Sequence, residues 1–150
     1  AQEYYADIKR RAAAAGRNPE QVLLFPGIDP IIADTDEQAV NQMFPYYEKF
    51  VGRLGRERGW GPASKGHYIQ EIEHGSLYVG SPDSVAKKIA HAITSVGASR
   101  FDMKYDNGPV PNVHLMKSIE LYATEVVPRV RKLLAEEQVN VFDSAFGNIR

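Results

Sequence analysis

Blocks of apolar residues follow one another along the chain with two different spacings. Apolar positions three and four residues apart predict amphipathic helices, whereas short unbroken or alternating apolar runs predict strands. On this basis the order of elements is α-β-α-β-α-β-α. The predicted helices cover residues 2–15, 35–58, 82–96 and 112–134, and the predicted strands cover 22–32, 77–79 and 100–105. Residues 59–75 predict an irregular connection with one short helix at 64–72.

Local signals mark the ends of several helices. Thr35 followed by Gln38 fits a capping box at the start of the second helix. Gly97 supplies a left-handed stop after the helix at 82–96. Asn112 is placed to cap the last helix, which we expect Pro128 to bend.

Strands that alternate with helices favour right-handed crossovers and a parallel sheet. The predicted fold class is α/β, with about three parallel strands and four main helices. Three parallel strands leave two open edges, so we expect either neighbouring units or a partner chain, including a homo-oligomer. We assign residues 1–136 to this domain and residues 137–150 to a polar tail without predicted structure.

Composition narrows the classes of function. The formal net charge of −1 offers no basic field for nucleic acid, and no apolar run reaches the roughly 20 residues that span a bilayer. The chain has no cysteine, which suits a reducing, cytoplasmic location. The histidines show no metal-ligand spacing, so no metal site is expected. Because the chain begins at Ala1 within a helical pattern, we expect a fragment of a longer protein.

Four segments, in their order and spacing, carry a resemblance that extends over about residues 4–134. They are "GRERGW" at 55–60, "GSLYVGSPDSVAKKIA" at 75–90, "GASRFDMKYDNGPVP" at 97–111 and "LMKSIELYATEVVPRVR" at 115–131. Together they resemble the C-terminal part of the luciferase-like flavin-dependent monooxygenases.

The resemblance implies a partial TIM-barrel-like fold, in which this chain corresponds to about the last three βα units. It also implies an oxidoreductase that uses reduced flavin mononucleotide (FMN) and O₂ on a small organic substrate, with the deazaflavin F420 as a possible replacement. Much of the family's flavin site comes from strands that this chain lacks. The alternative is a non-catalytic α/β module that self-associates through its open sheet edges.

The turn Gly80-Ser81-Pro82-Asp83 has two interpretations. A helix N-terminus after a glycine can bind a phosphate, which would make Gly80 and Ser81 cofactor ligands. Alternatively, Ser81 is an N-cap, Pro82 occupies the first helical position and Asp83 complements the helix dipole. The negative charge of Asp83 favours the second interpretation.

Other candidate site residues lie at predicted strand ends and in the irregular connection. Lys104 would hold a flavin phosphate or a substrate anion, and Asp102 would contact substrate, if both point into a barrel lumen. The alternative is that they pair with one another's neighbours, or with helices outside the sheet, because strand alternation alone does not choose a face. Asp29 is a substrate-binding candidate or a turn residue before Pro30. Trp60 is expected either to line a substrate pocket or to close the end of the barrel.

Overall fold

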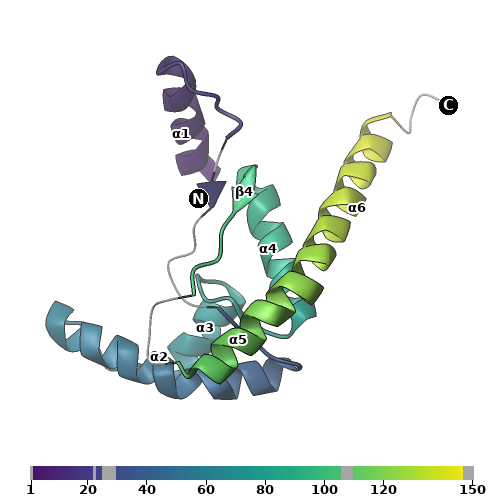
Figure 1. The fold of residues 1–150 in the computed structure, drawn as a ribbon. Coiled ribbons are helices and arrows are strands. Elements are labelled where there is room, and N and C mark those ends of the chain that lie inside the picture. Colours follow the sequence, from purple (N-terminus) through teal and green to yellow (C-terminus); the bar gives the residue numbers. More distant parts are fainter. Residues whose placement is uncertain (1, 22, 25–29, 106–109, 147–150) are drawn as a thin grey trace.

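The computed structural model describes residues 2–21, 23–24, 30–105 and 110–146 (Figure 1). The elements follow the order α1 (Gln2–Ala14), β1 (Leu23–Leu24), β2 (Ile31–Ile32), α2 (Asp36–Arg58), α3 (Lys65–Glu73), β3 (Val79–Gly80), α4 (Pro82–Val96), β4 (Arg100–Phe101), α5 (Asn112–Leu121), the π-helical segment η1 (Tyr122–Val126) and α6 (Val127–Phe146). Helices therefore dominate the described chain, and the strands are short.

The strands form two separate parallel pairs. Leu23 and Leu24 of β1 pair with Arg100 and Phe101 of β4, and β2 pairs with β3. The parallel orientation of the strands agrees with the sequence analysis, but the prediction of a single three-stranded sheet was wrong. The predicted strand at 22–32 is divided into β1 and β2, and Pro30, which has no N–H to donate to a ladder, lies directly before β2.

The β2–β3 pair is packed on both faces. Ile31 and Val79 belong to a core cluster shared with α2 and α3. Ile32 and Tyr78 belong to a second cluster, formed with buried residues of α4, α5, η1 and α6. This pair is therefore the buried centre that joins the two helical layers.

The predicted starts and stops of α2 and α4 are confirmed. Thr35 Oγ1 accepts a hydrogen bond from Gln38 N at 3.2 Å, and Gly59 ends α2 in the left-handed region. Helix α4 covers the predicted residues, with Ser81 as N-cap and Gly97 at φ 61° as the stop. These signals are local to the helix ends, which is why the sequence alone predicts them.

Helices α5 and α6 run on through η1 as one long rod (Figure 1). In η1 the Val127 N–H bonds to Tyr122 O, five residues back, just before Pro128, whose ring and missing N–H disfavour the ordinary α-helical pattern. Two predictions were wrong here. Pro111, with no side-chain cap, precedes α5, so Asn112 is its first residue, and α6 continues to Phe146 through most of the supposed unstructured tail.

Ser118 of α5 is fully buried and bonds to the backbone of β2 and the residue before it. Its Oγ accepts from Ile32 N at 2.9 Å and lies 3.3 Å from the Pro30 carbonyl oxygen, to which it donates. Ile31 and Ala33 donate to the β3 side instead. Ser118 therefore satisfies the strand donor that faces away from β3.

Replacing Ser118 with Ala should lower the free energy of unfolding by about 1–3 kcal/mol, because a buried backbone N–H loses its acceptor. Urea denaturation at neutral pH would measure this difference. Ser95→Ala is the matched control, since the hydroxyl of Ser95 lies 3.3 Å from His91 Nε2 within the same helix, α4. Equal stability of the Ser118→Ala and Ser95→Ala variants would contradict the role of Ser118.

Candidate functional site

The turn before α4 is a well-capped helix start. Ser81 has an extended backbone conformation, and its side chain accepts a hydrogen bond from Ser84 N at 3.4 Å. Pro82 follows at the first helical position, and Asp83 lies in the first turn, where it forms an ion pair with Lys87 at 2.6 Å. Each feature of the N-cap interpretation is present.

A carboxylate from another helix already lies at this turn. Asp36, the first residue of α2, accepts from Ser81 N through Oδ1 at 2.6 Å and from the Ser84 hydroxyl through Oδ2 at 2.8 Å. A Cβ at Gly80 would lie 2.8 Å from Asp36 Oδ1, so the approach requires glycine. The turn therefore binds an anion, and that anion belongs to the chain itself.

The contacts of Asp36 also set its ionisation. Burial raises the pKa of the Asp36 carboxyl, but the hydrogen bonds from Ser81 and Ser84 and the charge of Lys87 outweigh this effect and hold the pKa below its ordinary value. Asp36 is therefore ionised at neutral pH.

A flavin phosphate does not fit this turn. It would displace the Asp36 carboxylate from the Ser81 amide and would lie beside Asp83, so two negative charges would repel it. The geometry favours the cap interpretation, and the cofactor role of Gly80 and Ser81 stays a prediction.

The segment 100–105 presents two different faces. Phe101 and Met103 pack against the α4–α6 core cluster. The Tyr105 hydroxyl lies 3.4 Å from Ser118 Oγ, on the same helical side. If the alternation of an extended chain continues past β4 (Arg100–Phe101), Arg100, Asp102 and Lys104 would point away from Phe101 and Met103. We call these three residues the ionic face.

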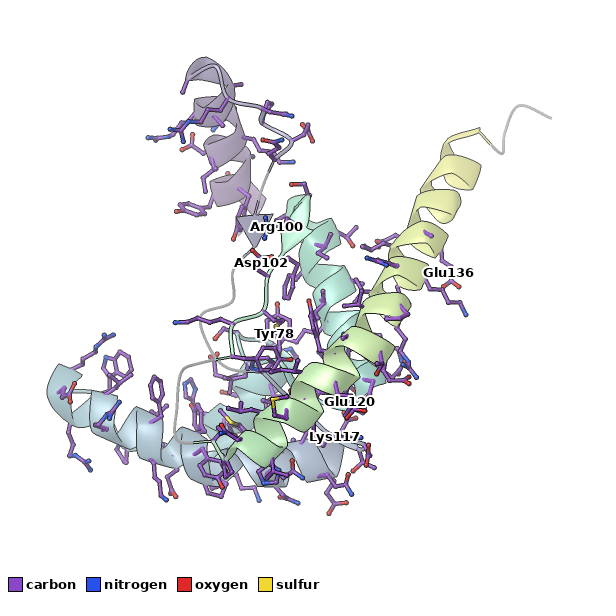
Figure 2. The ribbon with its side chains drawn as sticks, viewed as in Figure 1. Tyr78, Arg100, Asp102, Lys117, Glu120 and Glu136 are labelled. Atoms are coloured by element: carbon purple, nitrogen blue, oxygen red, sulfur yellow. The ribbon has the colours of Figure 1, made fainter. Side chains whose placement is uncertain are left out.

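Two residues of the ionic face are paired with each other. Arg100 Nε donates to Asp102 Oδ1 at 2.8 Å, with the Arg100 side chain 71% exposed and that of Asp102 31% exposed. Figure 2 shows the two residues next to one another at β4. Burial raises the pKa of the nearby Tyr122 hydroxyl, and the Asp102 charge adds to this rise. This pair is of the kind that the sequence offered as the alternative to a substrate contact, and the substrate role of Asp102 stays a prediction.

Asp29 and Trp60 are the remaining candidate site residues. Among the described residues, no contact connects Trp60 with Arg100, Asp102 or Lys104. Asp29 lies outside the described residues. Trp60 follows the C-terminal end of α2, is 53% exposed, and has the Arg58 guanidinium 5.3 Å from its ring centre. It borders a cavity of about 440 Å³ with Gly55 and Pro62. The substrate role of Trp60 stays a prediction.

Sequence reasoning missed Lys88. Its Nζ donates to the carbonyl oxygens of Glu71, Ile72 and Leu77 at 2.6–3.1 Å and lies 5.1 Å from the centre of the Tyr78 ring. Burial lowers the pKa of Lys88, but its three N–H groups are already engaged by the end of α3 and the segment that follows. It borders a cavity of about 560 Å³ between α2, α3 and α4. Backbone partners leave no pattern in a sequence, so no signal could have found this role.

The described residues were also searched for metal sites and membrane spans. No three potential ligands among their His, Asp and Glu side chains lie together as a metal would require. No helix within these residues combines the length and apolar character needed to cross a bilayer.

Comparison with known proteins gives consistent matches. A family model described as luciferase-like monooxygenase matches residues 1–100. N-acetyl-S-(2-succino)cysteine monooxygenase of Bacillus subtilis (strain 168) is 59% identical over 39 residues, which are 26% of this chain and 9% of that protein. Long-chain alkane monooxygenase of Geobacillus thermodenitrificans (strain NG80-2) is 27% identical over an alignment of 162 positions, gaps included, which covers 94% of this chain and 36% of that protein.

A solved structure shares the fold. It is a type II Baeyer-Villiger monooxygenase, the oxygenating constituent of 3,6-diketocamphane monooxygenase from the CAM plasmid of Pseudomonas putida, in complex with FMN. The match has a TM-score of 0.54 and 18% identity and covers 86% of this chain and 39% of that chain. The chain thus spans little more than a third of the length of the long-chain alkane monooxygenase and of this solved structure.

Replacing Asp36 with Asn should destabilise the protein in a pH-dependent way. A carboxyl whose folded pKa is lowered contributes stability above its unfolded pKa, and this contribution is lost as pH falls through the folded pKa. We expect a difference of about 1 kcal/mol in the free energy of unfolding at pH 7, shrinking steadily below about pH 4. Urea denaturation of both proteins from pH 7 to pH 2 measures it, and a difference that does not change with pH would contradict the assignment.

Replacing Ser81 with Ala should cost about 1 kcal/mol of stability, because Ser84 N loses its capping acceptor. Ser81→Thr is the matched control, since threonine retains the hydroxyl and the β-region preference of an N-cap. Thermal unfolding of the two variants tests this. A melting temperature of Ser81→Ala equal to that of Ser81→Thr would show that the cap contributes nothing.

Proposed function

We propose that this chain, which belongs to the luciferase-like monooxygenase family, forms the C-terminal part of a flavin-dependent monooxygenase barrel and lines its substrate cavity. The proposed reaction is the oxidation of a small organic substrate by O₂. The observation that carries the proposal is the parallel β1–β4 pair, which has helices on the side of Phe101 and an exposed ionic side chain, Arg100, on the other. This one-sided arrangement is what a section of an α/β barrel requires.

A barrel also explains the short strands. Parallel strands are stable in proteins where both faces and both edges are covered. Within the described residues each strand pairs with one neighbour, so a completed sheet would need further strands. The matched relatives are long enough to contain them. We therefore propose that the rest of the barrel, from the same protein or from a partner chain, packs against this section.

The proposed cofactor is a flavin, because the solved structure with the same fold contains FMN; F420 is the alternative within the family. A bound reduced flavin would supply the electrons that activate O₂. Because the turn before α4 does not fit its phosphate, we propose that the phosphate is held mainly by the part of the barrel outside this chain. The chain's own contribution would be to position the substrate and exclude water.

The relatives suggest two substrate classes. N-acetyl-S-(2-succino)cysteine carries carboxylates, whereas a long-chain alkane carries no polar group. Either class fits a monooxygenase of this family. The side chains that line the cavity must decide between them.

A second candidate function is a non-catalytic module that self-associates. The observation that favours it is exposed apolar surface on two helices: Val113 and Met116 on α5 are 69% and 64% exposed, and Tyr4 on α1 is 68% exposed. Val113 and Met116 lie three residues apart and so share one side of α5, and exposed apolar patches are typical of interfaces. These exposed side chains fit contact with a second copy of the chain as well as contact with the rest of the proposed barrel. With no cysteine in the chain, we propose a cytoplasmic location.

The decisive experiment joins this chain with the part of the Geobacillus relative outside the matched region. The two polypeptides are co-expressed, purified through a tag on one of them, and titrated with FMN by fluorescence quenching. We expect a 1:1 complex with an FMN dissociation constant in the micromolar range, and no comparable binding by either part alone.

The same preparation separates the two candidates. Val113→Asp with Met116→Asp adds charge to the exposed side of α5. If self-association is the function, the chain sediments as an oligomer, and the double variant is monomeric. If the chain is stable and monomeric and forms no FMN-binding complex, the monooxygenase proposal fails.

A further inference from the structure

The cavity of about 560 Å³ that Lys88 borders has an aliphatic interior. Its five apolar lining residues come from α2, α3, β3 and α4, and they are Val40, Ile69, Ile72, Val79 and Val85. Val79 and Val85 are 5% and 1% exposed, and the other three are partly buried against the core. The volume falls within the range of small-molecule pockets, roughly 300–1,000 Å³. Because four elements border it, the site is concave and suits a small molecule better than a flat protein surface.

Six polar side chains complete the described lining, and each of them already has a partner. They are Asp36, Glu73, Ser84, Lys87, Lys88 and His91. Asp36 accepts from Ser81 N at 2.6 Å and from the Ser84 hydroxyl at 2.8 Å. Lys87 forms its ion pair with Asp83 at 2.6 Å. The charges at the start of α4 are therefore compensated within the chain.

The other three polar residues of the lining are engaged as well. Lys88 Nζ donates to three backbone carbonyl oxygens. His91 Nε2 lies 3.3 Å from Ser95 Oγ, and Glu73, whose side chain is 59% exposed, lies 3.8 Å from His74 Nε2. Two carboxylates and two ammonium groups give the lining a formal charge of zero (2 − 2) with His91 neutral. An ion in the cavity would lose its water without gaining an uncompensated partner.

The aliphatic interior is equally unfavourable for ordered water. A buried water molecule uses about two to four polar partners, whereas the interior offers valine and isoleucine side chains. An apolar molecule would remove this surface from water and would leave the polar contacts of the lining intact. Along α4 the lining extends from Ser84 to His91, which is seven residues (91 − 84) or about 10 Å. The cavity therefore favours an uncharged apolar molecule of about this length or shorter.

We propose that the cavity between α2, α3 and α4 is a binding site for a small uncharged apolar molecule. Binding there needs neither flavin nor the rest of the proposed barrel, so the site goes beyond the proposed function and does not depend on it. Toluene is the simplest probe, and benzoate is its charged counterpart of similar shape. The cavity binds toluene and excludes benzoate, because a buried carboxylate would find only cations that are already paired.

The test uses the full 150-residue chain with ¹³C-labelled isoleucine and valine methyl groups, which all five aliphatic lining residues carry. Toluene is titrated below its solubility limit, and nuclear Overhauser effects locate contacts between its ring protons and the methyl groups. We expect saturable shifts and contacts at Val40, Ile69, Ile72 and Val85. Benzoate should bind at least about tenfold more weakly, because its carboxylate loses water on entry.

Replacing Ile69 with Phe should weaken toluene binding about tenfold, because the larger side chain occupies part of the cavity. Ile119→Phe is the matched control and should leave the affinity unchanged. Ile119 is 38% exposed on α5 and is not among the described residues that line this cavity. The methyl spectrum of each variant shows whether it retains the fold, and the comparison of toluene with benzoate in the unchanged chain needs neither variant.

Four results would overturn the site. Toluene contacts spread over exposed apolar residues such as Val113 would show an adventitious additive only. Equal affinities for toluene and benzoate would show that the cavity does not exclude charge. Unchanged toluene affinity in folded Ile69→Phe would place the probe elsewhere. Lining methyl signals that shift with protein concentration, without toluene, would mean that a second copy of the chain fills the cavity.

Discussion

The parallel pair β1–β4 is packed by helices on the side of Phe101 and Met103, while Arg100 on the other side is open to solvent. This asymmetry is the constraint on which the functional account depends. A parallel pair is stable where protein covers it. The exposed Arg100 and the single pairing of each described strand therefore support the proposal of further structure. The β2–β3 pair is different, since core clusters pack on both of its faces. One pair therefore holds the section together, and the other is where it would join a larger fold.

The contacts of Asp36 show how the helices of this chain are held in place relative to one another. Its carboxylate connects the start of α2 with the start of α4 through Ser81 and Ser84, 45 and 48 residues away. Lys88 ties α4 to the end of α3, and Ser118 ties α5 to β2. All three contacts satisfy backbone groups at the ends of elements. The section thus has internal order although it spans little more than a third of its long relatives.

What could be predicted from the sequence was local. The limits of α4 follow from Ser81, Pro82 and Gly97, which act within a few residues of the helix ends. The pairing of β1 with β4 and the bond between Asp36 and Ser81 depend on distant partners, which one sequence does not reveal. The helical continuation of α6 to Phe146 was also not predicted, because the scattered aromatic residues of this polar segment show no clear helical spacing.

For the candidate site, the sequence offered alternatives but could not choose between them. Packing of Phe101 and Met103 against the helices places these two residues only, and the roles of Asp102 and Lys104 stay predictions. The contact with Asp36 favoured the cap interpretation of Ser81 over phosphate binding. This preference required a three-dimensional contact between residues far apart in the sequence.

The most direct measurement of the central claim is amide hydrogen exchange at residues 100–103, in the monomeric chain and after addition of the complementary part of a relative. If β4 is an interrupted barrel strand, the amides on its edge away from β1 exchange rapidly in the isolated chain and become protected on assembly. Slow exchange of those amides in the monomer, unchanged by the added part, would mean that the edge is already covered and would contradict the account.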